Sequence, residues 1–157
     1  MTDLANDKQR LLAIEEIKQV KAKYFFGLDN KDWALWRAEV WAPDGELHVP
    51  EFQAEPFRGF EAVLAYVSES VGDQVSVHHG HMPIIEFTSD NDAKVIWAME
   101  DRLFRTKEQP LFDGSTLLHG WGHYRETYVK TDAKTNSGWR IKTSQLTRLR
   151  VEMTKVF

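Results

Sequence analysis

The sequence predicts an α+β fold in which helices come first and an antiparallel sheet follows. Before Gly72 the apolar residues recur every three or four positions, which is the period of a helix. After Gly72 they alternate with polar residues, which is the period of a strand. A chain of 157 residues, 42% of them hydrophobic, can bury one sizeable core. We therefore expect a single domain spanning residues 1–157.

The first expected element is a long amphipathic helix over residues 11–28. One face carries the apolar positions Ile17, Val20, Tyr24 and Leu28. Gly27 can adopt the left-handed conformation that closes helices, which would leave Asp29 just outside the end. Tyr24 and Asp29 are separated by about 140° on an ideal helix, so both reach one pocket only if the helix ends near Gly27.

The remaining elements are expected in the following order. Before Gly72 come a helix over residues 32–41 capped by Asn30 or Asp32, a turn at 43–45, a strand at 46–50, an irregular segment at 51–58 and a helix at 60–71. After it come strands at 75–87, 93–104, 117–130 and 139–150. Turn-forming stretches at 89–92 and 136–138 separate neighbouring strands.

Two strands raise questions about charged residues. Asp101 falls on the apolar face that also carries Val95, Trp97, Met99 and Leu103. Burying an isolated charge is expensive, so this carboxylate is either paired with an arginine or functional. In the last strand the alternation directs Ile141 to one face and Arg148 to the other unless a bulge intervenes. The sequence leaves that question open.

Three of the six histidines lie close together before the apolar run at 83–87. They are His78, His79 and His81. Histidine has an unperturbed pKa near neutrality, so this cluster is a candidate acid–base or metal site. A purely structural role competes with this interpretation for each histidine taken alone.

A metal site is the weaker of these alternatives. His79 and His81 share one strand face and Glu86 follows, which is similar to the metal motif of cupins. The flanking glycines of that motif are missing, and a small cupin barrel does not account for the largely helical first half. Thiolate ligands are also absent, because the sequence has no cysteine. We expect no metal and no organic cofactor.

Composition limits the possible partners. A net charge of −4 and a pI near 5.9 offer no broad basic field for nucleic acid. No apolar run reaches the ~18 residues needed to span a bilayer, and the first residues lack the pattern of a signal peptide. We expect a cytoplasmic protein that binds neither nucleic acid nor membrane, with an apolar small molecule as its partner.

The order of these features resembles a known family. It comprises the long first helix with Tyr24 and Asp29, a Trp-rich second helix, the His78 segment, and strands containing Trp97-Ala98-Met99-Glu100-Asp101, Gly120-Trp121-Gly122-His123-Tyr124 and Gly138-Trp139-Arg140-Ile141. Over nearly the whole chain this order resembles the SnoaL-like branch of the nuclear-transport-factor-two-like superfamily. The resemblance implies a cone-shaped α+β barrel, with a curved antiparallel sheet wrapped around the first helix. Its pattern is most similar to dehydratases such as scytalone dehydratase and bile-acid 7α-dehydratase, which need no cofactor.

The resemblance also implies roles for individual residues. Tyr24 would polarise a substrate carbonyl, Asp29 would orient a histidine, and His78 would be that histidine and the general base. Asp101 and an arginine of the last strand, here Arg148, match further site residues. Substrate-binding positions would be Trp41, His79, Trp97 and Tyr124, which fit a flat polycyclic or aromatic molecule. Spacing alone does not separate His78 from His79 as the base.

Several functions remain open on this basis. The same residues suit a dehydratase, a double-bond isomerase or an aldol-type cyclase, and the superfamily also includes ligand-binding proteins and oxygenase subunits. Trp97 lies on the strand where scytalone dehydratase has a second site histidine, and Tyr124 replaces one of its asparagines, so that substrate is not implied. A homodimer or homotrimer is expected.

Overall fold

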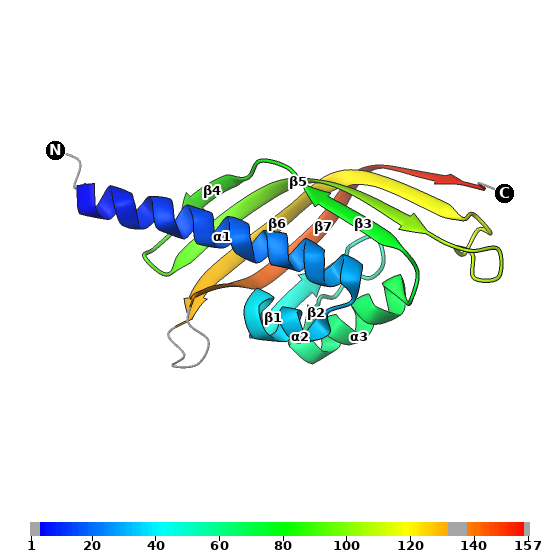
Figure 1. Cartoon of the computed structure of the whole chain (residues 1–157), viewed down its shortest axis with the longest axis horizontal. Helices are drawn as coiled ribbons and strands as arrows, with labels where there is room; N and C mark the ends of the chain where they lie inside the picture. The colour runs from blue at the N-terminus through cyan, green and yellow to red at the C-terminus, as the bar shows by residue number, and fades with distance from the viewer. Residues whose placement is uncertain (1–3, 132–137, 156–157) are drawn as a thin grey trace.

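A long helix lies along a curved sheet in the computed structural model, which describes residues 4–131 and 138–155 (Figure 1). The helix, α1, spans Leu4–Asn30, and most of the strands follow α3 (Phe60–Val71), which occupies the predicted residues. This arrangement confirms the α+β class. Residues 136 and 137 of the expected turn at 136–138 lie outside the described part of the chain.

The sheet is mixed and open. Its strands are β1 (Trp41–His48), β2 (Phe57–Arg58), β3 (Ser76–Gly80), β4 (Ile84–Phe87), β5 (Asp92–Phe104), β6 (Leu117–Thr131) and β7 (Gly138–Thr154). Their order is β2-β1-β7-β6-β5-β3, and β4 also pairs with β5. The cone is therefore not a closed barrel.

The strands that follow α3 pair antiparallel, as expected, and the one parallel pair of described strands involves β1. β1 runs parallel to β7, whereas the other pairs of described strands are antiparallel. Parallel strands require a long connection between them. Most of the chain separates β1 from β7, so this requirement is met.

The first helix does not end at Gly27 as expected, but continues to Asn30. Lys31, rather than a glycine, has the left-handed φ of 58° that follows the helix. Gly27 matters for a different reason: a Cβ atom there would lie 2.6 Å from Cδ1 of Trp36. Glycine thus allows the next segment to pack closely against α1.

The second helix is shorter than predicted. Asp32 caps α2 (Trp33–Leu35), as expected, by accepting a hydrogen bond from the Leu35 N–H at 3.0 Å. A π-helical turn, η1 (Trp36–Val40), follows, and β1 begins at Trp41. Residues 43–45, expected to form a turn, lie within β1 where its register with β7 shifts.

The strand expected at residues 75–87 is divided into β3 and β4, which both pair with β5. Pro83 has no backbone N–H to donate, which favours a break before β4. A Cβ atom on Gly80 would lie 2.6 Å from the Phe25 ring. The glycine therefore lets α1 approach the end of β3.

The first of two bulges in β7 determines the direction of Arg148. The pairing with β6 leaves Lys142 and Leu149 without opposite residues. One extra residue reverses the alternation of faces that follows it. The bulge at Lys142 therefore turns Ser144 and Arg148 to the face that carries Ile141, which answers the question left open by the sequence.

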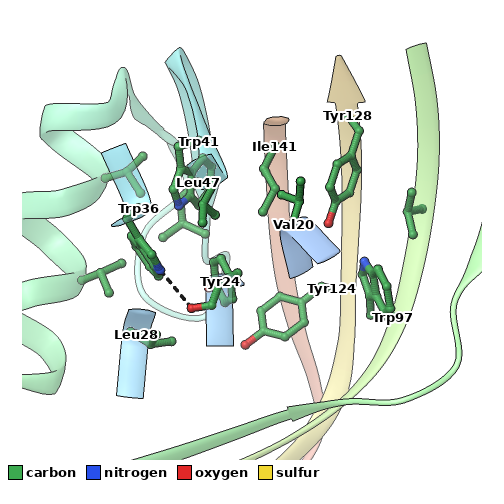
Figure 2. Packing of buried hydrophobic residues seen from close by; sticks show 14 of the residues in the cluster. Val20, Tyr24, Leu28, Trp36, Trp41, Leu47, Trp97, Tyr124, Tyr128 and Ile141 are labelled. Atoms are coloured by element: carbon green, nitrogen blue, oxygen red, sulfur yellow. Dashed lines mark hydrogen bonds between the residues drawn. The ribbon is translucent and has the colours of Figure 1, made fainter. Parts of the chain in front are cut away.

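The main core lies between α1 and the sheet. Ile17, Val20 and Tyr24 of α1 are buried, as expected for the face that packs on the sheet. Figure 2 shows Val20 and Tyr24 among aromatic residues of η1, β5 and β6. Among the described residues, no helix is long and apolar enough to cross a bilayer.

Candidate active site

Asp29 and His78 form a hydrogen-bonded pair where the end of α1 meets β3. Nδ1 of His78 lies 2.6 Å from Oδ1 of Asp29, and the His78 backbone N–H donates to Oδ2 at 2.9 Å. The Ser76 hydroxyl also donates to Oδ1, at 3.0 Å. Three donors from one strand thus hold the carboxylate, although Asp29 lies on the last turn of the helix rather than beyond it.

The pair leaves the other ring nitrogen of His78 available. A carboxylate accepts a hydrogen bond from Nδ1–H, which favours the tautomer whose lone pair is on Nε2. The hydrogen bonds of His78 with described residues involve its backbone N–H and Nδ1, and none involves Nε2. His78 is 8% exposed and its pairing with Asp29 is part-buried, so this nitrogen is a candidate base in a largely dry place.

A second pair lies next to His78 across the sheet. Asp101 is directly opposite His78 in the pairing of β3 with β5. Its Oδ2 accepts a hydrogen bond from Nη2 of Arg148 at 2.5 Å, so the buried carboxylate has an arginine partner. Burial lowers the pKa of Arg148, but the Asp101 charge and hydrogen bond outweigh it, so the pKa is raised. Arg148 also donates its backbone N–H to Glu51 at 2.8 Å.

Gly120 makes room for this second pair. A Cβ atom there would overlap Oδ1 of Asp101 and would lie 2.8 Å from Nε of Arg148. These two buried atoms, an acceptor and a donor, have no hydrogen-bond partner among the described residues.

Two tyrosines lie beside these pairs in the interior. The Tyr24 ring stacks on Trp36 with centroids 4.8 Å apart, and its edge meets the Tyr124 ring at 5.8 Å (Figure 2). Burial raises the pKa of both phenols, and the Glu126 charge raises that of Tyr24 further. Both therefore remain protonated hydrogen-bond donors at neutral pH.

The expected substrate-binding residues occupy two different environments. Trp41, Trp97 and Tyr124 are at most 5% exposed and form part of the core between α1 and the sheet. His79 is exposed and points to the opposite side of β3 from His78. The structure thus pairs His78, rather than His79, with Asp29.

The alternative metal cluster is not assembled among the described residues. His79, His81 and Glu86 are all exposed, and His81 lies between β3 and β4. No group of three histidine, aspartate or glutamate residues in the described chain is arranged to hold a metal ion.

Lys21 and Glu126 are buried beside the tyrosines and were not anticipated. Their side chains are 2% and 0% exposed and lie 2.7 Å apart. Lys21 follows Ile17 by four residues and precedes Tyr24 by three, so it falls on the apolar face of the helix. Glu126 lies between Tyr124 and Tyr128 with the inward parity of β6. A charged residue at each of these two inward-facing positions was the sequence feature that could have indicated a buried ion pair.

The candidate active site does not coincide with the cavity at the other end of α1. A hollow of about 550 Å³ lies at the other end of α1, where Arg10, Phe87 and Lys130 are among its lining residues. It contains none of Asp29, His78, Asp101 and Arg148. The Asp29–His78 pair is the more specific indication of function.

Comparisons with known proteins agree with this fold. A model of the SnoaL-like domain matches residues 9–145. Among solved structures, a protein of Kribbella flavida has a TM-score of 0.79 and 19% identity, covering 91% of this chain and 95% of that chain. A hexachlorocyclohexane dehydrochlorinase, LinA-type3 of Novosphingobium barchaimii, has a TM-score of 0.77 and 18% identity, covering 96% of each chain. A Novosphingobium aromaticivorans protein provisionally assigned as a scytalone dehydratase has a TM-score of 0.74 and 22% identity, covering 96% of this chain and 97% of that chain.

Proposed function

The chain belongs to the SnoaL-like domain family, and from this premise we propose that it is a cofactor-independent lyase that removes water from a hydrophobic ketone. The observation that carries the proposal is the 2.6 Å contact between His78 and Asp29, which leaves Nε2 of His78 without a described partner. The dehydrochlorinase and dehydratase assignments of similar structures support an elimination. Each is below 25% identical, so they support the fold directly and the reaction only by analogy.

The reaction begins with proton transfer to His78. Nε2 takes a proton from the carbon next to the substrate carbonyl, and Asp29 stabilises the imidazolium that forms. The electron pair of the broken C–H bond moves to the carbonyl oxygen, producing an enolate. Tyr24, kept protonated by burial, donates a hydrogen bond to that oxygen.

Loss of hydroxide from the β-carbon completes the elimination. As the enolate collapses, the C–O bond breaks, and the departing hydroxyl takes the proton held by His78 to leave as water. The product is an α,β-unsaturated ketone.

The substrate class follows from the surroundings. Aromatic side chains dominate the interior beside the two pairs, including Tyr24, Trp97 and Tyr124. A flat polycyclic or aromatic ketone suits aromatic surroundings of this kind better than a small polar acid does.

Deuterium exchange tests the proton-transfer step directly. Two probes are 2-tetralone, a bicyclic aromatic ketone, and a saturated 3-oxosteroid, each incubated with enzyme in D₂O and followed by NMR. We expect wild-type protein to accelerate exchange next to the carbonyl of at least one probe, and His78→Ala to abolish this acceleration. No acceleration with either probe would contradict the proposal.

The subsequent step is tested with β-hydroxy derivatives of the same ketones. Loss of water gives a conjugated ketone that is detected by its ultraviolet absorbance. If the enzyme instead only moves the double bond of a β,γ-unsaturated ketone into conjugation, it is an isomerase and the lyase assignment is wrong. Accelerated exchange retained in His78→Ala would mean that a group other than His78 takes the proton, and no acceleration by wild type would favour a ligand-binding role.

A further inference from the structure

The buried pair of Lys21 and Glu126 takes no part in the proton transfers described above. Oε1 of Glu126 accepts from Nζ of Lys21 at 2.7 Å and from the Ser144 hydroxyl at 2.9 Å. Oε2 accepts from the Tyr128 hydroxyl at 2.7 Å. Both carboxylate oxygens are therefore satisfied inside the core.

Burying an ion pair in a protein core carries a large desolvation cost. Removing two charges from water costs free energy that their attraction repays only in part, and apolar residues of similar volume are often equally stable there. Stability of the core alone therefore does not explain why charged residues occupy these two positions.

The Lys21 ammonium contacts the rings of the two site tyrosines. Its Nζ lies 4.0 Å from the ring centroid of Tyr24 and 3.7 Å from that of Tyr124. The Tyr24 ring also stacks on Trp36, so it contacts both an indole and a cation. A cation over an aromatic ring is attracted to the π-electrons of that ring.

We propose that Lys21 is a positioning residue that fixes Tyr24 and Tyr124 and strengthens the Tyr24 hydroxyl as a donor to the enolate oxygen. The inference rests on the proposed function. A cation over the ring withdraws electron density from the phenol, which favours partial negative charge on its oxygen. Glu126 alone has the opposite effect, because its charge disfavours negative charge on Tyr24. Lys21 offsets that charge at 2.7 Å.

The double variant Lys21→Met/Glu126→Gln tests this role without leaving a lone buried charge. The methionine fills the space of the lysine stem, and the glutamine side chain can still accept a hydrogen bond from Tyr128 or Ser144. The matched control is Lys23→Met/Glu39→Gln, the same chemical change in a partly exposed pair of α1 and η1 with a 2.5 Å contact. Deuteration of whichever ketone the wild type exchanges faster provides the measurement.

We expect kcat of the Lys21/Glu126 variant to fall about tenfold or more with KM changed by less than about threefold, because the lost interaction acts in the transition state. The control should stay within about twofold of wild type. A folded Lys21/Glu126 variant with wild-type kcat would overturn the inference while leaving the dyad intact. If wild type exchanges neither ketone, or His78→Ala exchanges as fast as wild type, the proposed function itself fails.

The pH profile provides a second readout. Burial lowers the pKa of Lys21 to about 8, although Glu126 raises it. The groups facing the ammonium are Glu126, Tyr124 and, on its own helix, Tyr24, with Tyr128 behind Glu126 and the neutral Ser144 on β7. Burial raises the pKa of all three tyrosines, so none of them loses a proton near pH 8.

The wild-type rate should therefore fall as pH rises through about 8, where Lys21 loses its charge. Lys21→Arg keeps the cation at higher pH, so its alkaline decline should move upward or disappear. An unchanged decline in Lys21→Arg would contradict the inference, even if the double variant does not fold.

Discussion

Asp29 accepts hydrogen bonds from the Ser76 hydroxyl and from two donors of His78. His78 is therefore held through both its backbone N–H and its imidazole ring. Lys31 extends this arrangement by donating to the Ser76 hydroxyl at 3.1 Å and to the Asp29 carbonyl at 3.2 Å. The left-handed conformation of Lys31 follows α1 directly, which brings its ammonium back to this corner. The base is thus oriented by residues of two elements.

The glycine beside the Asp101–Arg148 pair permits a sharp test at the level of one residue. Gly120→Ala would place a methyl group on top of Oδ1 of Asp101, so that this carboxylate or the strand must move. We expect a loss of roughly 1–3 kcal/mol in the free energy of unfolding, as for other overpacked interiors. Urea denaturation measures it, and a change below about 0.5 kcal/mol would show that the site has room for the methyl group.

Lys21 also predicts how stability depends on pH. Its pKa is lowered by burial from 10.5 to about 8, so between these values the unfolded chain holds a proton that the folded chain has lost. The unfolded state then binds more protons, and this residue makes the free energy of unfolding rise with pH.

The measurement compares wild type with Lys21→Met/Glu126→Gln by denaturation from pH 7 to 9.5. That range stays below pH ~10, at which tyrosines of the unfolded chain ionise. The stability of wild type relative to the variant should increase above pH 8. A difference that is constant or decreases with pH would contradict the burial of a charged lysine.

At the level of elements, the sequence was most informative where one periodicity ran without interruption. α3 and the long strands β5 and β6 match their predicted limits closely. The exact end of α1 was missed because Gly27 serves close packing rather than helix termination. The direction of Arg148 required the bulge at Lys142, which depends on pairing with β6 and leaves no mark in the β7 sequence.

Gly27→Ala tests this account of the helix end. Alanine inside a helix normally stabilises by about 0.5–1 kcal/mol relative to glycine. Here its Cβ atom would lie 2.6 Å from Cδ1 of Trp36, so we expect a net destabilisation of roughly 1–2 kcal/mol in thermal or urea unfolding. In a Trp36→Leu background most of that penalty should vanish. A stabilising Gly27→Ala would mean that the helix end can move away from Trp36.

At the scale of the molecule, the change in periodicity was enough to predict the α+β class, whereas the Asp29–His78 contact was implied by the resemblance to the SnoaL-like family. Pairing across the sheet could not be predicted in the same way. The sequence could not separate His78 from His79, and the structure does so because His78 lies opposite Asp101 on the inner face. The parallel pair formed by β1 and β7 joins segments that are far apart in the sequence, so local sequence patterns do not predict it.

A homodimer or homotrimer remains a prediction for the whole molecule. Light scattering coupled to size-exclusion chromatography should give two or three times the chain mass of 18.3 kDa. A mass equal to that of one chain would contradict it.

The most direct test of the account is a double-mutant cycle on Asp29 and His78, measured as ketone deuteration by folded proteins. A general base typically contributes about 10²–10⁴-fold, so His78→Ala and Asp29→Asn should each lose rate heavily. Because the two residues act as one unit, the double variant should be little slower than the slower single variant. Fully additive losses would show that they act separately, and wild-type rates in both single variants would contradict the proposed active site.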